Sequence, residues 1–130
     1  MTISRSVAYG LLAVGYIARH EKDGIILSDT IAREYNIPVE YLLKILHQLV
    51  RARILRSKRG PRGGFSLARP ISKITMLDVI EGVEGPMIIS LGLEEYAPKE
   101  KFAAVATTAY DKVIAQSRNA FKQVKLSALL

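Results

Sequence analysis

Apolar residues recur at helical spacing near the middle of the chain. At about 100° per residue, Leu42, Ile45, Leu46 and Leu49 fall on one side of a helix, and polar residues occupy the opposite side. Pro38 suits the first helical position, because the amide hydrogen that proline lacks has no partner there. The pattern predicts an amphipathic helix with one buried stripe and one polar face.

The next segment has the pattern of two short strands joined by a tight turn. Ile54 and Leu55 form a short apolar run, and residues 65–67 (FSL) alternate apolar and polar as a half-buried strand does. Residues 59–64 (RGPRGG) are rich in the glycine and proline that tight turns use. A helix followed by a basic hairpin is typical of a winged helix-turn-helix.

A helix-turn-helix also needs a shorter helix before the longer one. Ser28 is a candidate N-cap, and Ile31 and Ala32 would form the buried side of the short helix. Asn36 would end it just before the longer helix begins. Residues 25–27 are apolar and extended, and they predict a third strand for the small sheet.

Further helices are predicted on both sides of this unit. Ser4 is a plausible N-cap for a first helix that runs to about residue 20, and Thr75 with Asp78 makes a capping box for another helix. A long helix is expected from about Pro98 to about Lys122. The predicted fold is therefore mainly α with a small β-hairpin wing (α+β): a winged helix-turn-helix followed by a long C-terminal dimerisation helix.

The long helix predicts a second copy of the chain. At about 1.5 Å per residue, it is too long to be covered by so small a domain. The alternative is a helix folded back on its own domain. The residues expected at a dimer interface are Phe102, Val105, Ala106, Ala109 and Val113.

The charge is concentrated in one half of the chain. Residues 1–70 hold 12 Lys and Arg against 5 Asp and Glu, whereas residues 71–130 hold 7 of each, so the first half carries the whole net charge of +7. Seven basic residues and no acid lie between Arg51 and Arg69, and such like charges repel one another unless an anion is near. A polyanion such as double-stranded DNA is the expected partner. The candidate DNA-binding residues are Glu40, Tyr41, Leu43, Lys44, His47, Gln48 and Arg51 on the helix, and Arg56, Lys58, Arg59 and Arg62 on the hairpin.

Several function classes lack support in the sequence. The chain has no cysteine, which excludes disulfides, thiolate zinc sites and cysteine-held iron–sulfur clusters. The glycines of residues 60–64 lack the strand-then-helix context of a nucleotide loop. Asp78, Glu81 and Glu84 are better explained as a solvated face, or as partners for the basic half, than as a metal site. We expect no cofactor and no enzymatic activity.

Membrane association is not expected either. No run of the sequence approaches the roughly 18 apolar residues of a membrane span, and the N-terminal stretch has no cleavage-like site. We therefore expect a cytoplasmic protein.

The order and spacing of several short motifs resemble the Rrf2 family of bacterial winged-helix transcriptional regulators. The resemblance covers roughly residues 1–86, and the remainder fits only in its long helix and its closing KLSALL. The matching residues are Tyr9-Gly10, Ile31-Ala32, Ile37-Pro38, Tyr41-Leu42, residues 57–70 (SKRGPRGGFSLARP), Ile74-Thr75, residues 78–81 (DVIE) and residues 83–85 (VEG).

The resemblance implies a homodimeric DNA-binding regulator whose long helix crosses between protomers. It also implies base reading by Glu40, Leu43 and Lys44 and minor-groove contact by Arg59. Well-known members hold an iron–sulfur cluster with three cysteines between residues 85 and 106, and this chain has none there. Other members lack the cluster and respond to a partner protein, to a small molecule or to no known signal, and which of these applies here stays open.

These observations predict three segments. Residues 1–86 would form the DNA-binding domain, 87–101 a variable linker or sensor segment, and 102–130 the dimerisation helix and C-terminal tail. The expected function is a repressor that binds a palindromic operator as a homodimer. The alternative is a winged-helix module that binds RNA or a protein partner rather than specific DNA.

Overall fold

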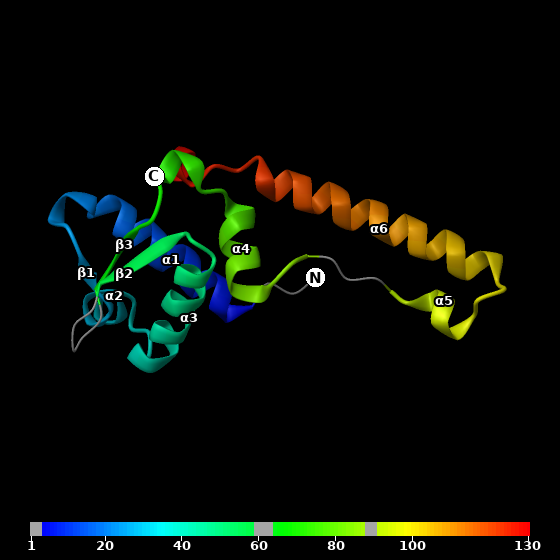
Figure 1. Cartoon of the computed structure of the whole chain (residues 1–130), viewed down its shortest axis with the longest axis horizontal. Helices are drawn as coiled ribbons and strands as arrows, with labels where there is room; N and C mark the ends of the chain where they lie inside the picture. Colours follow the sequence, from blue (N-terminus) through cyan, green and yellow to red (C-terminus); the bar gives the residue numbers. More distant parts are fainter. Residues whose placement is uncertain (1–3, 59–63, 88–90) are drawn as a thin grey trace.

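The computed structural model describes residues 4–58, 64–87 and 91–130. A body of helices and a small sheet holds the first part of the chain, and a long helix projects from it (Figure 1). In chain order the elements are α1 (Arg5–Arg19), the 3-10 turn η1 (Glu21–Asp23), β1 (Ile26–Leu27), α2 (Ser28–Tyr35), α3 (Val39–Arg51), β2 (Leu55–Lys58), β3 (Gly64–Leu67), η2 (Ile71–Lys73), α4 (Met76–Glu84), α5 (Leu93–Tyr96), α6 (Lys101–Lys122) and η3 (Leu126–Leu129).

The core of the body lies where α1, α3 and α4 meet. The four stripe residues predicted for α3 are each no more than 1% exposed, so that prediction is confirmed. α1 and α4 approach closely at Gly10, where an added Cβ would lie 3.1 Å from a methyl carbon of Val83. Because α3 is buried along one side only, its opposite side remains on the surface.

The turn between α2 and α3 confirms the predicted helix-turn-helix. Asn36 adopts a left-handed conformation with φ of 54°, which asparagine tolerates better than most residues. The backbone N–H of Ile37 then donates to the carbonyl of Ala32 over 2.9 Å, and the Ile37 side chain is buried. The short helix therefore ends as expected, and the chain turns directly into α3.

The predicted N-cap at Ser28 is wrong. α2 begins at Ser28 itself, and Leu27 holds the cap position with extended backbone (φ −78°, ψ 143°). The reason is that β1 runs straight into the helix, so the extended conformation of a cap falls on the last residue of the strand. Ser28 is buried, at 1% exposed.

A three-stranded antiparallel sheet forms the wing, in the order β1-β3-β2. Ile26 pairs with Phe65, and Leu55 pairs with Leu67. Phe65 is fully buried and joins the sheet to the core. The third strand predicted from residues 25–27 is therefore confirmed. The tip of the hairpin, residues 59–63, lies outside the described residues.

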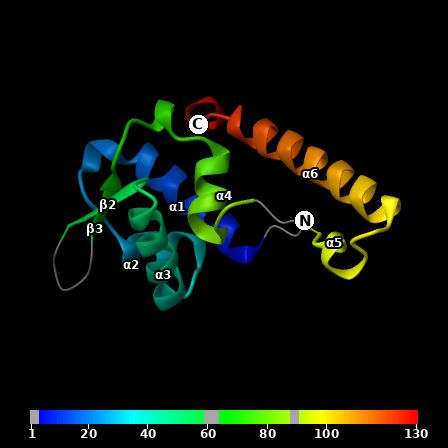
Figure 2. The same ribbon diagram turned by 45° about the vertical axis from the view of Figure 1, so that its right-hand side comes forward.

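α5 and α6 together form an arm that extends away from the body (Figures 1 and 2). The arm is attached at the C-terminal end of α6, where the Val124 carbonyl accepts from the Met76 N–H over 2.8 Å. Close by, the Leu126 N–H donates to the Ile74 carbonyl over 3.0 Å. α5 lies along the other end of α6. The long helix thus exists as predicted, although it begins at Lys101 rather than at about Pro98.

The capping box predicted at the start of α4 is present. The Asp78 N–H donates to Thr75 Oγ1 over 3.1 Å, and the Thr75 N–H donates to Asp78 Oδ2 over 2.9 Å. With these elements in place, the predicted fold class is confirmed: a mainly helical chain with a small antiparallel sheet.

Candidate nucleic-acid interface

The outer side of α3 carries the polar residues that the sequence placed there. Leu43 and Gln48 are partly exposed, because they lie at the borders of the buried stripe. Val39 is 36% exposed at the start of the helix. Sequence reasoning missed Val39, although its position one helical turn before Leu43 could have signalled it. The other predicted DNA-binding residues of this helix are exposed in the structure: Glu40, Tyr41, Lys44, His47 and Arg51.

His47 connects the exposed side of α3 to the wing. Its ring lies 5.7 Å from the ring of Phe65 in β3, centroid to centroid, in an edge-on arrangement. Since Phe65 is buried in the core, the sheet is fixed directly beside the outer side of α3. The helix and the hairpin therefore form one continuous surface.

Tyr41 faces α1 rather than the wing. Its hydroxyl lies 2.6 Å from Ser6 Oγ, and its ring meets the Tyr9 ring edge-on at 5.6 Å. This side chain therefore ties the start of α1 to α3. Tyr41 remains 42% exposed, so the same hydroxyl lies on the surface that α1 and α3 share.

The wing contributes two described cations. Arg56 and Lys58 are exposed on β2. Arg56 Nη2 donates to the carbonyl of Ala68 over 3.2 Å, so its guanidinium is held near the strand, whereas Lys58 stands at the strand end. The other two hairpin candidates, Arg59 and Arg62, lie outside the described residues.

The seventh cation of the basic run has a different role. Arg69 Nη2 lies 3.5 Å from Asp78 Oδ2, and Arg69 Nη1 donates to the carbonyl of Lys73 over 3.2 Å. These contacts join the end of the wing to α4. The Arg69 side chain therefore forms contacts within the protein, which the charge pattern alone did not show.

Each acid of the predicted cluster on α4 has its own partner. Asp78 pairs with Arg69, and Glu84 accepts a hydrogen bond from the Ser4 hydroxyl. Glu81 pairs with Arg118 of α6, and this hydrogen bond lowers the pKa of Glu81 below its ordinary 4.5 although partial burial raises it. Within the described ranges, no group of three or more His, Cys, Asp or Glu side chains could hold a metal ion.

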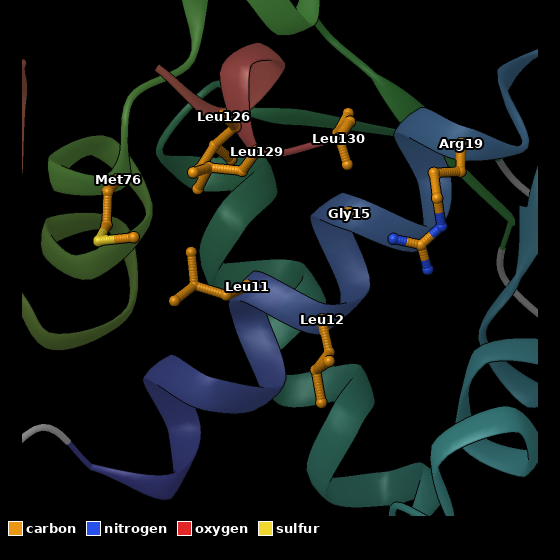
Figure 3. A pocket seen from close by; sticks show the side chains of 8 residues that line it. All are labelled: Leu11, Leu12, Gly15, Arg19, Met76, Leu126, Leu129 and Leu130. Atoms are coloured by element: carbon orange, nitrogen blue, oxygen red, sulfur yellow. The ribbon is translucent and has the colours of Figure 1, made fainter. Parts of the chain in front are cut away.

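A separate groove of about 200 Å³ lies between α1, the start of α4 and η3 (Figure 3). Its apolar walls include Leu11, Met76 and Leu126, and the Arg19 side chain extends beside Gly15 at the other end. Arg19 Nη2 donates to the Tyr35 hydroxyl over 2.7 Å. The lining residues come from α1, α4 and η3, so the groove is distinct from the surface formed by α3 and the wing.

Comparison with known proteins identifies the family. A family model described as Rrf2, an iron-dependent transcriptional regulator, matches residues 3–130. The HTH-type transcriptional regulator CymR of Bacillus subtilis is 31% identical over 101 residues, which cover 78% of this chain and 73% of CymR. A candidate HTH-type transcriptional regulator of Aquifex aeolicus is 41% identical over 81 residues, or 62% of this chain and 56% of that protein. The chain thus spans little more than half the length of the Aquifex relative.

Solved structures agree with this fold. The global cysteine regulator CymR of B. subtilis superposes with a TM-score of 0.75 at 26% identity, over 99% of this chain and 95% of that one. T. potens IscR shares the fold, with a TM-score of 0.74 at 23% identity over 99% of this chain and 85% of that one.

The family description mentions iron, but the residues present do not fit a cysteine-held cluster. The sequence contains no cysteine, so the thiolate ligands of such a cluster are missing. In the described part of the chain, no helix is long and apolar enough to cross a membrane.

The family model covers nearly the whole chain, and CymR matches most of it in sequence and in fold. The chain belongs to the Rrf2 family.

Proposed function

We propose that this chain is a DNA-binding transcriptional regulator, a repressor that binds a palindromic operator as a homodimer. The observation that carries the proposal is the single surface formed by the outer side of α3 and the basic strand β2 beside it. A helix of this kind fits the major groove of B-DNA, and the adjacent hairpin reaches the phosphates and the next groove.

Each part of this surface has a distinct task. Glu40, Leu43 and Lys44 lie toward the N-terminal end of α3, where recognition helices meet base edges. His47 and Gln48 follow on the same helix and can donate to bases or phosphates. The cations Arg51, Arg56 and Lys58 hold the backbone, and Arg59 and Arg62 enter the minor groove.

The homodimer is supported by the exposed side of α6. Phe102 is 78% exposed, and Val105 and Val113 are each 57% exposed. At 100° per residue, Ala106 and Ala109 lie on the same side, so a continuous apolar stripe faces solvent. An exposed stripe of this kind marks an interaction surface. A second copy of α6 covers it and sets two recognition helices on one operator.

The three segments follow from this arrangement. Residues 1–86 bind DNA, 102–130 dimerise, and 87–101 respond to a small-molecule or protein effector. Repression arises because the dimer blocks access of polymerase to the promoter. The protein acts in the cytoplasm, with no enzymatic step and no cofactor.

Selection of bound sequences from a random duplex pool tests the proposal. It is done at near-physiological salt, because nonspecific binding depends strongly on salt. We expect a palindrome whose half-sites are about one helical turn apart. An intact dimer that recovers no consensus would refute specific DNA binding and favour an RNA or protein partner.

A further inference from the structure

The carboxylate of Glu81 joins three segments of the chain. Arg118 Nε donates to Oε2 over 3.0 Å, and Arg118 Nη2 donates to Oε1 over 2.9 Å, so the ion pair is bidentate. The N–H of Met87, at the start of the 87–101 segment, donates to the same Oε2 over 3.0 Å. One side chain of α4 thus holds both α6 and the segment that leads to the arm.

The contacts around Glu81 and Arg118 favour the charged forms of both side chains. The side chain of Glu81 is 20% exposed and that of Arg118 is 42% exposed. The hydrogen bond from Arg118 lowers the pKa of Glu81, the Met87 N–H lowers it further, and the bond to Glu81 raises the pKa of Arg118. Bidentate Arg–carboxylate pairs fix direction as well as distance. The pair therefore has the geometry of a positioning contact.

Among the described residues, a hydrogen bond and an ion pair join the C-terminal end of α6 to α4, on either side of Phe121, which packs against the core. The hydrogen bond runs from the Met76 N–H to the Val124 carbonyl, and the ion pair joins Arg118 to Glu81. At 1.5 Å per residue, Arg118 lies about 9 Å from Val124, and Lys101 lies about 35 Å from it. A shift of about 1 Å at Arg118, pivoting on Val124, therefore moves the Lys101 end by about 4 Å.

We propose that Glu81 and Arg118 are positioning residues that set the separation of the two recognition helices in the dimer, and so the half-site spacing of the operator. The inference rests on the proposed function, since it needs a dimer joined through α6. A change of about 4 Å at the arm is close to the 3.4 Å of one base-pair step. Loosening the pair should therefore change the preferred spacing by about one base pair.

The experiment measures affinity for one operator rebuilt with its half-sites moved together or apart by one or two base pairs. We expect the wild-type dimer to prefer one spacing by about tenfold, because twisting DNA to fit the wrong spacing costs energy. Arg118→Glu places two carboxylates together and should flatten or shift that preference. The exchanged pair, Glu81→Arg with Arg118→Glu, should restore the ion pair but leaves no carboxylate at residue 81 to accept from the Met87 N–H, so it should restore the preference in part.

The controls separate positioning from simple loss of stability. Lys122→Glu makes the same charge change one turn further along α6, at an exposed residue that forms no ion pair with Glu81, and should leave the spacing profile unchanged. Arg118→Lys keeps the charge but loses the bidentate geometry, so its profile should be broader than that of the wild type. Each variant is compared only where sedimentation shows a dimer and circular dichroism shows a fold.

A second readout follows the arm without DNA. Because the chain has no cysteine, spin labels at introduced cysteines replacing Glu34 in α2 and Lys101 in α6 are unique. Their distance distribution, measured in dimers diluted with unlabelled chain, should broaden in Arg118→Glu and narrow again in the exchanged pair. If Arg118→Glu does not fold, Arg118→Lys serves for both readouts.

The outcomes distinguish this inference from the proposed function. If the wild type shows no sequence-specific binding, the proposed function fails. If the wild type has a sharp spacing preference that folded, dimeric Arg118 variants retain, only the positioning role is overturned. A shifted preference that the exchanged pair restores in part supports the role, because a merely structural residue would change affinity at every spacing alike.

Discussion

Removing the charge of Lys58 tests how the wing engages DNA. Lys58 is exposed at the end of β2, and across the described segments it has no carboxylate within ion-pair distance. Its ammonium is therefore available for a phosphate. We expect Lys58→Gln to weaken binding to specific and random duplexes alike, because a phosphate contact carries no sequence information.

The magnitude follows from counterion release. Each phosphate contact contributes about 0.9 to the slope of log affinity against log salt concentration, so a dimer that loses two contacts loses about 1.8. Between about 50 and 200 mM salt, the ratio of the wild-type affinity to the Lys58→Gln affinity should then fall about twelvefold. Fluorescence anisotropy with a labelled operator across this range measures both slopes.

The decrease in the slope also shows whether Lys58 contacts a phosphate in one protomer or in both. A decrease of about 0.9 would mean that only one protomer places Lys58 on a phosphate. Reduced affinity with an unchanged slope would refute the phosphate contact. Lys73→Gln is the matched control, because Lys73 is equally cationic and exposed but lies in η2, which packs against η3. Its slope should equal that of the wild type.

The remaining predictions concern the recognition helix, the dimer, a helix cap and pH. Lys44→Ala should cost about 1–3 kcal/mol on the selected operator if Lys44 meets a base, and equal weakening on random DNA in a gel-shift would show a phosphate contact instead. Phe102→Asp should convert the dimer to monomer in sedimentation velocity, whereas Ala104→Asp, on a different side of α6, should not. Thr75→Ala should reduce the free energy of unfolding by about 0.5–2 kcal/mol in urea titrations, because the Asp78 N–H loses its side-chain acceptor. Glu81 has a folded pKa below its ordinary 4.5, so its contribution to stability is full above that pH and is lost as pH falls through the folded pKa. The stability difference between wild type and Glu81→Gln should therefore shrink as the pH falls below 4.5 and through the folded pKa, and a constant difference would refute the linkage.

The sequence predicted α3 well because periodicity records burial directly. Leu42, Ile45, Leu46 and Leu49 form the buried stripe in the structure as the spacing implied. The capping box at Thr75 was equally local, since both of its hydrogen bonds join residues three apart. Ser28 shows the limit of such local rules. A serine before a helix resembles a cap, but the preceding strand already supplies the extended residue.

Long-range pairing had no comparable signal. Arg118 and Glu81 are 37 residues apart, and nothing in the spacing of either helix identifies one as the partner of the other. The short helix α5 was also missed, because its four residues are too few to show a period. The role of Leu43 and Lys44 in base reading stays a prediction, as does that of Phe102 in the dimer.

The structure changes what the basic run implies for DNA binding. Counted along the sequence, the residues from Arg51 to Arg69 offer seven cations to a polyanion. In the fold, Arg69 is paired with Asp78, whereas Arg56 donates only to the neutral Ala68 carbonyl and keeps its charge. A cation that is already neutralised releases fewer counterions when DNA binds. The total salt slope should therefore fall below the value expected from all seven cations, because Arg69 contributes less to it than the unpaired cations do.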